Sequence, residues 1–271
     1  MFKVITWNVN SVRSRLEQLL LLLKNESPSA VLLQEIKCED HVFPLKEIEE
    51  MGYNVAIFGQ KSYNGVAILS KEPLEDVKRG FHNFETAEAR YIEAVTYFKG
   101  KALKLASIYV PNGNPTGEEA KQNIKAVNSK RFEYKLSFLR SLREILKEEL
   151  KHNEHFIIGG DINIAPEDID VYSVKNWEGK VCFLPEEKSE FRAILNLGYS
   201  DAIRSLAPTT QMFSWYDYRT RGFDSGKGLR IDHFLTSPKS TDALHAFKVL
   251  DYYRGLPAAS DHVPMEIELK L

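Results

Sequence analysis

A carboxylate and an amide stand two residues apart at the end of a strongly apolar segment. The run Phe156 to Ile158 is rich in β-branched residues, which predicts a buried strand, and two glycines then precede Asp161 and Asn163. The glycines predict a tight turn or a close approach of the backbone to another segment. Alternate side chains of an extended chain point the same way, so Asp161 and Asn163 are expected on one face. An acid beside an amide at the carboxyl end of a strand favours a polar site, although an Asx-rich turn explains this segment almost equally well.

Polar side chains recur at the ends of the other predicted strands. They are Asn8, Asn10, Glu35, Tyr109, Asp232, Asp261 and His262. Each alone is explained by a turn, a cap or a structural histidine, but strands that converge would bring four carboxylates together. At an effective dielectric constant of 20, two such charges about 4 Å apart repel by roughly 4 kcal/mol, so the cluster needs a cation or shifted pKa values. Oxygen ligands with few histidines and no cysteine favour Mg²⁺ or Mn²⁺ over Zn²⁺, and a hard cation beside acids suits phosphoryl chemistry.

The elements expected to position these residues alternate between strands and helices. The segment 2–10 alternates as a strand, Ser11 is expected to cap a helix with a leucine stripe, and 30–35 is a second strand. This order favours an α/β layer. The polar, glycine-containing segment 112–128 is expected to be a loop. Further strands are expected at 53–58, 65–69, 90–98, 102–110, 212–215, 229–235 and 263–269, and helices at 130–151 and 187–197.

The composition indicates a globular chain without a strong electrostatic preference. The chain has 271 residues, of which 43% are hydrophobic, and a formal net charge of -2. This is enough apolar material for a sizeable core and argues against disorder. No linker or repeat divides the sequence, so we expect one domain over 1–271. A strongly basic chain would indicate a polyanion partner, whereas here such a partner must meet a local patch.

The cysteines and the apolar runs indicate a cytoplasmic protein that does not enter a membrane. Cys38 and Cys182 have no metal or redox spacing, and no signal peptide precedes the first strand-like run. Both are therefore expected to be ordinary buried thiols in a reducing compartment. The run Leu19 to Leu23 is far shorter than the roughly 20 residues of a membrane span, and charged residues flank it.

Basic and aromatic residues are interleaved near residue 220. The aromatic residues are Trp215 and Tyr218, and the cations that follow them are Arg219, Arg221, Lys227 and Arg230. Such a mixture is what a phosphate backbone with its sugars requires. A solvated surface loop is the more frequent explanation for a loop of this charge.

The ordered set of motifs resembles the exonuclease III family. The motifs are Trp7-Asn8-Val9-Asn10, Leu33-Gln34-Glu35, Gly52-Tyr53-Asn54-Val55, Tyr109-Val110-Pro111, Gly160-Asp161-Ile162-Asn163, Phe183-Leu184-Pro185-Glu186-Glu187, Phe213-Ser214-Trp215-Tyr216-Asp217-Tyr218-Arg219, Gly228-Leu229-Arg230-Ile231-Asp232 and Ser260-Asp261-His262. Each motif is weak alone, but their order is specific and covers essentially the whole chain. The sequence departs from the family pattern at Ser11, where the family usually has Gly, and Asn10 is an Asp in some relatives.

The resemblance implies an α/β (α+β) fold, a four-layer sandwich of two packed β-sheets flanked by helices. It implies a Mg²⁺-dependent monomer, with Mn²⁺ as a substitute, that acts on double-stranded DNA at abasic sites and 3′ ends. The implied activities are cleavage 5′ to abasic sites, 3′→5′ exonuclease action and removal of 3′-blocking groups.

The resemblance also implies a role for each site residue. The implied catalytic residues are Tyr109, Asp161, Asn163, Asp232 and His262. The implied metal-site residues are Asn8, Asn10, Glu35, Asp161, Asn163 and Asp261. The implied DNA-binding residues are Arg90, Trp215, Arg219, Lys227, Leu229 and Arg230.

Two other functions fit parts of the pattern. A phosphomonoesterase or phosphodiesterase of the same fold, acting on inositol phosphates or lipids, would keep the acids and His262 but is not expected to keep the segment from Trp215 to Arg230. An inactive nucleic-acid-binding scaffold would lack a carboxylate or the histidine, and none is missing here.

Overall fold

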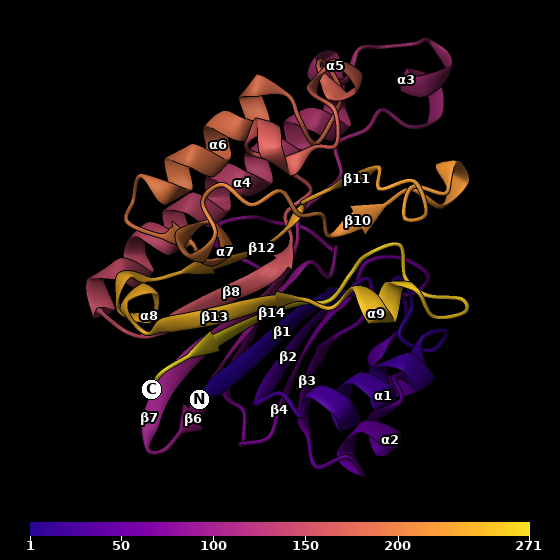
Figure 1. Ribbon diagram of the computed structural model, residues 1–271. Helices are drawn as coiled ribbons and strands as arrows, with labels where there is room; N and C mark the ends of the chain where they lie inside the picture. The colour runs from indigo at the N-terminus through magenta and orange to yellow at the C-terminus, as the bar shows by residue number, and fades with distance from the viewer.

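Two six-stranded sheets pack face to face in the computed structural model, which describes residues 1–271 (Figure 1). The first sheet has the strand order β13 (Leu244–Val249), β14 (Met265–Leu269), β1 (Phe2–Asn8), β2 (Ala30–Gln34), β4 (Val66–Ser70) and β3 (Asn54–Phe58). The second has the order β5 (Glu75–Arg79), β6 (Tyr91–Phe98), β7 (Lys101–Tyr109), β8 (Phe156–Asp161), β12 (Asp232–Thr236) and β9 (Ser200–Asp201). A separate pair, β10 (Trp215–Tyr216) and β11 (Gly228–Leu229), lies beyond the end of the second sheet.

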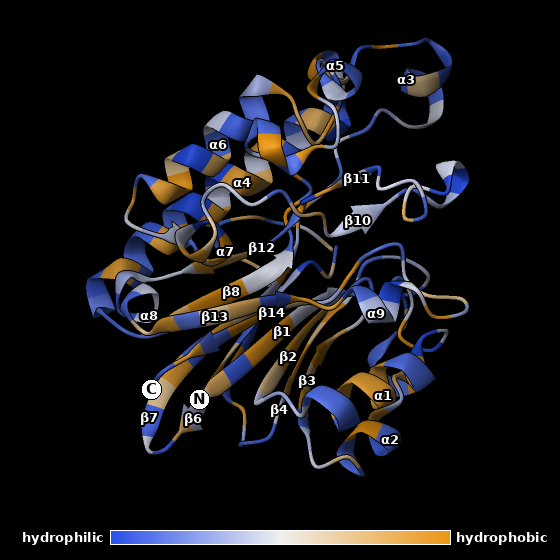
Figure 2. Ribbon diagram, in the orientation of Figure 1, coloured by the Kyte–Doolittle hydropathy of each residue, from blue (hydrophilic) through white to orange (hydrophobic).

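Helices cover the outer face of each sheet (Figure 1). The helices beside the first sheet are α1 (Leu16–Glu26), α2 (Leu45–Glu49) and α9 (Asp251–Arg254). Those beside the second are α4 (Lys130–Glu149), α6 (Pro185–Leu195) and α8 (Pro238–Asp242), and two short ones beyond its end are α3 (Gly117–Lys121) and α5 (Val174–Trp177). Helix α7 (Ala202–Leu206) instead packs against β12 and β13 and contributes to the cluster between the sheets. In Figure 2 the helices carry separate hydrophobic and hydrophilic faces, as expected of elements that cover a sheet. No helix combines the length and the apolar character that crossing a membrane requires.

Three apolar clusters hold these layers together. The inner cluster joins the facing sides of both sheets, with Leu32 from one and Phe234 from the other. A second cluster lies between the first sheet and α1, where Leu19 is buried, and a third lies between the second sheet and the helices α4 and α6. The predicted four-layer sandwich is therefore confirmed, because each sheet buries one face against the other sheet and one against helices.

The polar strand ends meet because each sheet contains one parallel pair at its centre. Strands β1 and β2 run parallel, as do β7 and β8. Carboxyl ends of parallel neighbours lie at the same edge, which places Asn8 beside the residue before Glu35, and Tyr109 opposite Asp161. The antiparallel strand β12 begins at this edge, so Asp232 is paired with Asp161.

The glycines before Asp161 serve a close approach of the backbone and not a turn. Both lie inside β8, and a Cβ on Gly160 would stand 1.9 Å from the carbonyl oxygen of Ile108 on β7. A Cβ on Gly159 would stand 2.7 Å from Leu32 of the facing sheet. Glycine is thus required where β8 touches both neighbours.

Several local predictions were wrong. The helix expected from Ser11 begins at Leu16, because Asn10 and Ser11 have φ values of 46° and 92° and continue as an irregular turn. Strands β5, β9 and β13 were not expected. All five residues of β5 are exposed and β9 has only two residues, so neither shows the alternation that identifies a strand from sequence. The segment 112–128 contains α3 as well as loop.

Candidate active site

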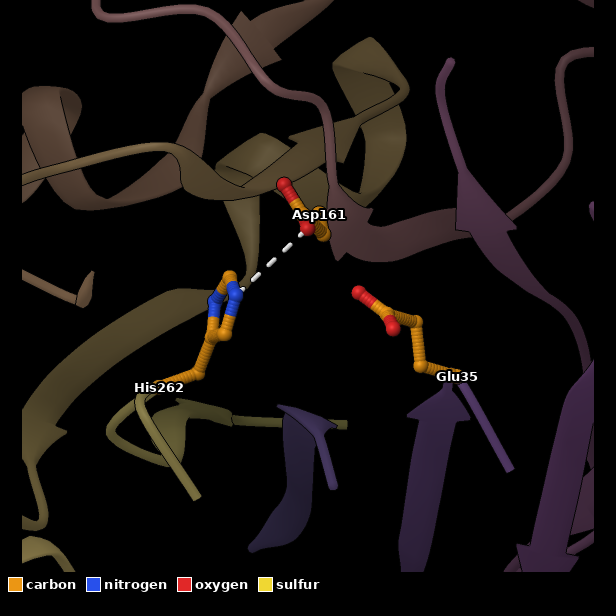
Figure 3. A group of neighbouring side chains, drawn as sticks. All are labelled: Glu35, Asp161 and His262. Carbon is orange, nitrogen blue, oxygen red and sulfur yellow. Dashed lines mark ion pairs between the residues drawn. The ribbon is translucent and has the colours of Figure 1, made fainter. Parts of the chain in front are cut away.

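Three ionisable side chains converge where the two sheets meet at their polar edge. Ligand atoms of Glu35, Asp161 and His262 all lie within 4.8 Å of one another, and Figure 3 shows the three side chains pointing toward a common space. Glu35 follows β2 in a left-handed conformation, with φ of 49°, and Asp161 ends β8. Asn8 bridges the two acids, since its amide nitrogen lies 2.9 Å from Glu35 Oε1 and 3.0 Å from Asp161 Oδ2.

This bridge changes the role expected for Asn8. The resemblance implied a place for Asn8 in a metal site, but its nitrogen faces the acids while its oxygen accepts a hydrogen bond from the backbone N–H of Asn10. In this arrangement Asn8 fixes the separation of Glu35 and Asp161 and offers them no oxygen.

The two acids differ in their affinity for protons. Burial raises the pKa of Asp161, the charges of Asp232 and Glu35 raise it further, and His262 opposes them. Burial also acts to raise the pKa of Glu35, but the Lys37 ammonium and the Asn8 hydrogen bond hold it below its ordinary value. A buried carboxylate whose charge is disfavoured next to a charged one is the environment that a divalent cation would stabilise. The donor set of this pair, hard carboxylate oxygens, fits Mg²⁺ or Mn²⁺.

His262 lies between two carboxylates, which favour its protonated form over metal ligation. Its Nδ1 lies 2.8 Å from Asp232 Oδ2, and its Nε2 lies 3.7 Å from Asp161 Oδ2. Burial acts to lower the pKa of His262, but Asp232 and Asp161 outweigh it and raise the pKa well above its ordinary value. An imidazolium has no free lone pair for a metal, and its Nε2–H is available to a substrate oxygen. The Asp232–His262 pair implied by the resemblance is present.

Lys37 is a site residue that the motifs did not single out. Its Nζ lies 2.8 Å from Glu35 Oε2 and also contacts Asn10 Oδ1. None of the motifs contains a fixed positive partner for the acids, although Lys37 stands only two residues after Glu35. The left-handed backbone at both residues, with φ of 49° and 53°, turns Lys37 back onto the carboxylate.

Asn10 and Asp261 form a separate pair at the rim. Asn10 Nδ2 lies 2.9 Å from Asp261 Oδ1, and Trp215 Nε1 lies 3.0 Å from Asp261 Oδ2. Burial would raise the pKa of Asp261, but the charge of His262 and these two hydrogen bonds hold it low. Asp261 thus connects Trp215 on β10 to the turn at Asn10 that follows β1.

Tyr109 presents a neutral hydroxyl to the site. Burial, followed by the charges of Glu35 and Asp161, raises the pKa of Tyr109 well above its ordinary value. Arg90 lies over the Tyr109 ring at 4.7 Å from the centroid, and its Nε lies 2.6 Å from Glu88 Oε2. The implied contact of Arg90 with DNA is not supported, because the side chain is only 6% exposed and already paired. Arg90 instead packs on the Tyr109 ring and donates to the Tyr109 backbone oxygen at 3.3 Å.

Asn163 reaches the site by a different geometry from the one expected. The strand ends at Asp161, and Asn163 has φ of 55°, so the two residues do not share a face of an extended strand. Instead the Asn163 backbone N–H donates to Asp161 Oδ1 at 3.0 Å. The Asn163 side chain donates to Val110 O and accepts from Asn112, a residue outside the predicted site. Asn163 therefore braces Asp161 from the side.

These polar groups line one part of a cleft of about 610 Å³ whose other part is aromatic and apolar. Trp215 and Leu229 pair across β10 and β11 and both line it. Trp177, which the motifs did not identify, meets Trp215 edge to face with ring centroids 6.3 Å apart. Cys182 also lines the cleft, and burial raises the pKa of its thiol to about 12, so it is no nucleophile.

The basic loop separates into exposed and buried cations. Arg219, Arg221 and Lys227 are exposed, and Arg219 lines the cleft. Arg230 is fully buried, with Nε 2.6 Å from Asp170 Oδ1 and a second nitrogen 2.8 Å from Asp201 Oδ2. The predicted contact of Arg230 with DNA is wrong, because its guanidinium is enclosed and neutralised by these acids.

The fold and the site together define a phosphoester-type hydrolase architecture with two sheets contributing to one acidic centre. The chain belongs to the endonuclease/exonuclease/phosphatase family, whose model matches residues 5–262.

Individual relatives and solved structures resemble the chain along its whole length. It is 35% identical to exodeoxyribonuclease III of Haemophilus influenzae over 276 residues, covering 99% of this chain and 100% of that protein. The structure of the 3′ phosphatase NExo from Neisseria, bound to a product DNA hairpin, superposes with a TM-score of 0.92 at 33% identity, and each chain is covered completely. An AP endonuclease from Archaeoglobus fulgidus gives a TM-score of 0.90 at 32% identity, again with complete coverage of both chains.

Proposed function

We propose that this protein is a metal-dependent DNA-repair nuclease that hydrolyses phosphodiester bonds in duplex DNA, 5′ to abasic sites and at 3′ ends. The observation that carries the proposal is the pair of His262 and Asp232, 2.8 Å apart, with His262 facing the buried acid Asp161 in a cleft that also has an aromatic wall. The relatives named as exodeoxyribonuclease III, 3′ phosphatase and AP endonuclease support this choice of substrate.

The side chains suggest a division of labour around one phosphate. Asp161 is a buried carboxylate with a raised pKa, which makes it a stronger base than an exposed acid, and the Asn163 N–H fixes its second oxygen. In the proposal it orients the attacking water and accepts its proton. His262 Nε2–H and the Tyr109 hydroxyl donate to the non-bridging oxygens, where negative charge increases in the transition state. Each of these donors is already held by a partner of its own, Asp232 or Arg90.

Glu35 is the residue that would hold Mg²⁺, with Mn²⁺ as a substitute, next to Asp161, which remains the proposed base. A hard divalent cation there would supply charge neutralisation for the phosphate oxygens. Asp261 is outside the group of ligand atoms that lie within 4.8 Å of one another, Asn10 is paired with Asp261, and the side-chain oxygen of Asn163 accepts from Asn112. We therefore assign them to supporting the site and not to direct ligation.

The aromatic cleft is proposed to receive the abasic sugar. Trp177, Trp215 and Leu229 offer an apolar wall that a deoxyribose without its base can fill. A normal nucleotide must first be unstacked, which costs a few kcal/mol, and its base would then compete for the same space. Arg219, Arg221 and Lys227 are proposed to meet the phosphate backbone at the rim, since the formal net charge of -2 leaves binding to local cations.

The proposed cellular setting follows from the thiols and from the composition of the site. Cys38 and Cys182 are free and buried, which suits a reducing cytoplasm where DNA is repaired. All residues of the proposed site come from one chain, so we propose that the protein acts as a monomer. Sedimentation in the presence and absence of DNA measures this directly.

A duplex with a single abasic site, compared with a blunt duplex, tests the function. Purified protein should cleave the first 5′ to the abasic site and shorten the second from its 3′ ends with Mg²⁺ or Mn²⁺, and EDTA should abolish both reactions. Asp161→Asn is the matched inactive variant and excludes a contaminating nuclease. Hydrolysis of inositol phosphates without any action on DNA would overturn the proposal in favour of a phosphatase of the same fold. Full DNA cleavage in EDTA would overturn the metal assignment alone.

A further inference from the structure

A completely buried ion pair lies behind the catalytic edge of the second sheet. Lys135 on α4 and Glu187 on α6 both have side chains with no exposed surface, and Lys135 Nζ contacts Glu187 Oε2. Lys135 interrupts the otherwise apolar buried face of α4, between Phe132 and Phe138. Charges are rarely buried without a specific partner, and replacing such a pair by apolar residues is often neutral for stability. Stability alone is therefore a weak explanation for this pair.

Every proton of the Lys135 ammonium has an acceptor, and two of the acceptors belong to the site. Besides Glu187, Nζ donates to the backbone oxygen of Asn163 at 2.7 Å and to that of Asn112 at 3.2 Å. An ammonium has three N–H donors, so its hydrogen-bonding capacity is filled. Glu187 is likewise committed, because its Oε1 accepts the backbone N–H of Leu184 at 3.0 Å.

The contact with Asn163 leads directly to the proposed base. Lys135 holds the carbonyl of Asn163, and the N–H of the same residue donates to Asp161 Oδ1 at 3.0 Å. Asn163 has a left-handed backbone, with φ of 55°, which costs free energy for a residue other than glycine and persists only where the surroundings enforce it. The ammonium holds the backbone carbonyl of Asn163, while Val110 and Asn112 hold its side chain.

The contact with Asn112 holds the loop that follows β7. Asn112 Nδ2 donates to Asn163 Oδ1 at 3.1 Å, so the two residues held by Lys135 also hold each other. The next residue, Gly113, has φ of 91°, and a Cβ there would stand 3.0 Å from Lys135 Cδ. The loop thus lies directly against the lysine stem.

We propose that Lys135 and Glu187 are positioning residues of the nuclease, which hold Asn163 and Asn112 in place and through Asn163 aim the carboxylate of Asp161. This inference rests on the proposed function, and it assigns a catalytic purpose to two helix residues that touch no substrate. A displacement of about 1 Å in a catalytic group costs roughly 100-fold in rate, so a small movement of Asn163 is enough to be measured.

The decisive comparison separates the cost of an unpaired charge from the loss of positioning. Lys135→Met removes the ammonium and leaves Glu187 unpaired, so both the melting temperature and kcat should fall. The double variant Lys135→Met/Glu187→Gln removes both charges and keeps an acceptor for Leu184. Its melting temperature should return close to that of the wild type. Its kcat on abasic DNA should stay roughly 100-fold below the wild-type value, with little change in KM. A double variant that regains kcat together with stability would overturn the proposal.

Hydrogen exchange gives a readout independent of turnover. In the metal-free protein, the backbone amide of Asn163 should exchange faster in the double variant, because its carbonyl anchor is gone. Unchanged exchange over residues 161–165 would overturn the proposal even if kcat fell. If the wild-type protein fails to cleave DNA, the proposed function fails, and the exchange experiment still decides whether Lys135 holds Asn163.

The matched control is the ion pair at the other end of α4. Lys104 on β7 contacts Glu149, the last residue of α4, with side chains 12% and 17% exposed. Lys104→Met/Glu149→Gln changes the charge in the same way but lies away from Asn163. It should leave kcat and the exchange of residues 161–165 unchanged.

Discussion

Lys37 Nζ lies 2.8 Å from Glu35 Oε2, on the acid proposed to hold the metal. The lysine is partly exposed, with 27% of its side chain accessible, and also contacts Asn10. A monovalent cation of the protein thus stands next to the position proposed for a divalent one. The two cations repel each other while both are attracted to Glu35.

Removal of the Lys37 charge should therefore strengthen metal binding. Lys37→Met is expected to lower the Mn²⁺ dissociation constant roughly 3- to 10-fold, a modest factor because solvent screens a partly exposed charge. Titration calorimetry or electron paramagnetic resonance of Mn²⁺ measures it without DNA. Lys46→Met, an exposed lysine on α2, is the control and should change nothing. Weaker metal binding in Lys37→Met would show that the lysine organises Glu35 more than it competes with the ion.

The Asp232–His262 pair should determine how activity falls at high pH. The pKa of His262 is raised in the folded protein, so the imidazolium persists below that raised pKa and is lost only as pH rises through it. Asp232→Asn keeps the shape but removes the largest of the charges that raise this pKa, so the mutant should lose its imidazolium first. Its deficit on abasic DNA should deepen between pH 6 and 8. The double variant Asp232→Asn/His262→Ala should lose little more activity than His262→Ala alone. Additive losses of activity, with a pH profile parallel to that of the wild type, would show that Asp232 and His262 do not act as a pair.

The salt dependence of DNA binding should identify the exposed cations as the phosphate contacts. Arg219 and Lys227 are exposed, so replacing both with Ala should reduce the slope of log affinity against log salt by about 0.9 for each lost phosphate contact. Fluorescence anisotropy over a salt series measures the slope, with Asp161→Asn in the background to prevent cleavage. An unchanged slope would move the binding surface toward Lys121, Lys125 and Lys130.

Arg230 should affect stability and its pH dependence instead of DNA binding. Burial acts to raise the pKa values of Asp170 and Asp201, but Arg230 holds both below the ordinary range. Depressed carboxyl pKa values contribute stability above the unfolded value near 3.9, and this stability is lost as pH falls through the lower folded values. Arg230→Met should cost about 3–5 kcal/mol at pH 7, because it removes the guanidinium that both buried acids share and leaves only Arg204 in contact with Asp170.

The sign of the pH effect should reverse in this variant. Without the guanidinium, burial favours protonation of the two acids, so Arg230→Met should be less destabilised at pH 5 than at pH 7. Urea unfolding at both pH values tests this. Arg219→Met, whose side chain is 88% exposed, should remain within about 0.5 kcal/mol of wild type. An Arg230→Met protein of normal stability but weak DNA binding would contradict the burial assignment.

Trp215 should matter more for abasic DNA than for a small phosphodiester. Trp215→Ala removes a wall of the cleft and also the hydrogen bond to Asp261 Oδ2. Trp215→Phe removes the same hydrogen bond but keeps most of the apolar surface, so it should retain more of the preference for abasic DNA. Comparing kcat/KM on abasic DNA and on a nitrophenyl phosphodiester measures that preference. Equal losses on both substrates would limit Trp215 to supporting the fold.

The sequence alone predicted most of the strands and that several end in groups able to act on a phosphate. This was possible because alternation of apolar residues and the polar residues that follow them are local properties, visible at Trp7-Asn8 and at Gly160-Asp161. The ordered motifs added the fold and the pairing of Asp232 with His262. Strands without local alternation, such as β5, stayed hidden.

Only the tertiary structure decided what each charge does. Arg219 and Arg230 stand in one loop sequence, yet one is in solvent and the other lies between Asp170 and Asp201, which come from distant segments. Likewise, in the sequence Lys135 is one position of a predicted helix. Its contacts with Glu187 and with the Asn163 carbonyl exist only in the folded chain. Burial and pairing depend on residues far apart in the chain, and they set the sign and strength of every electrostatic effect at this site.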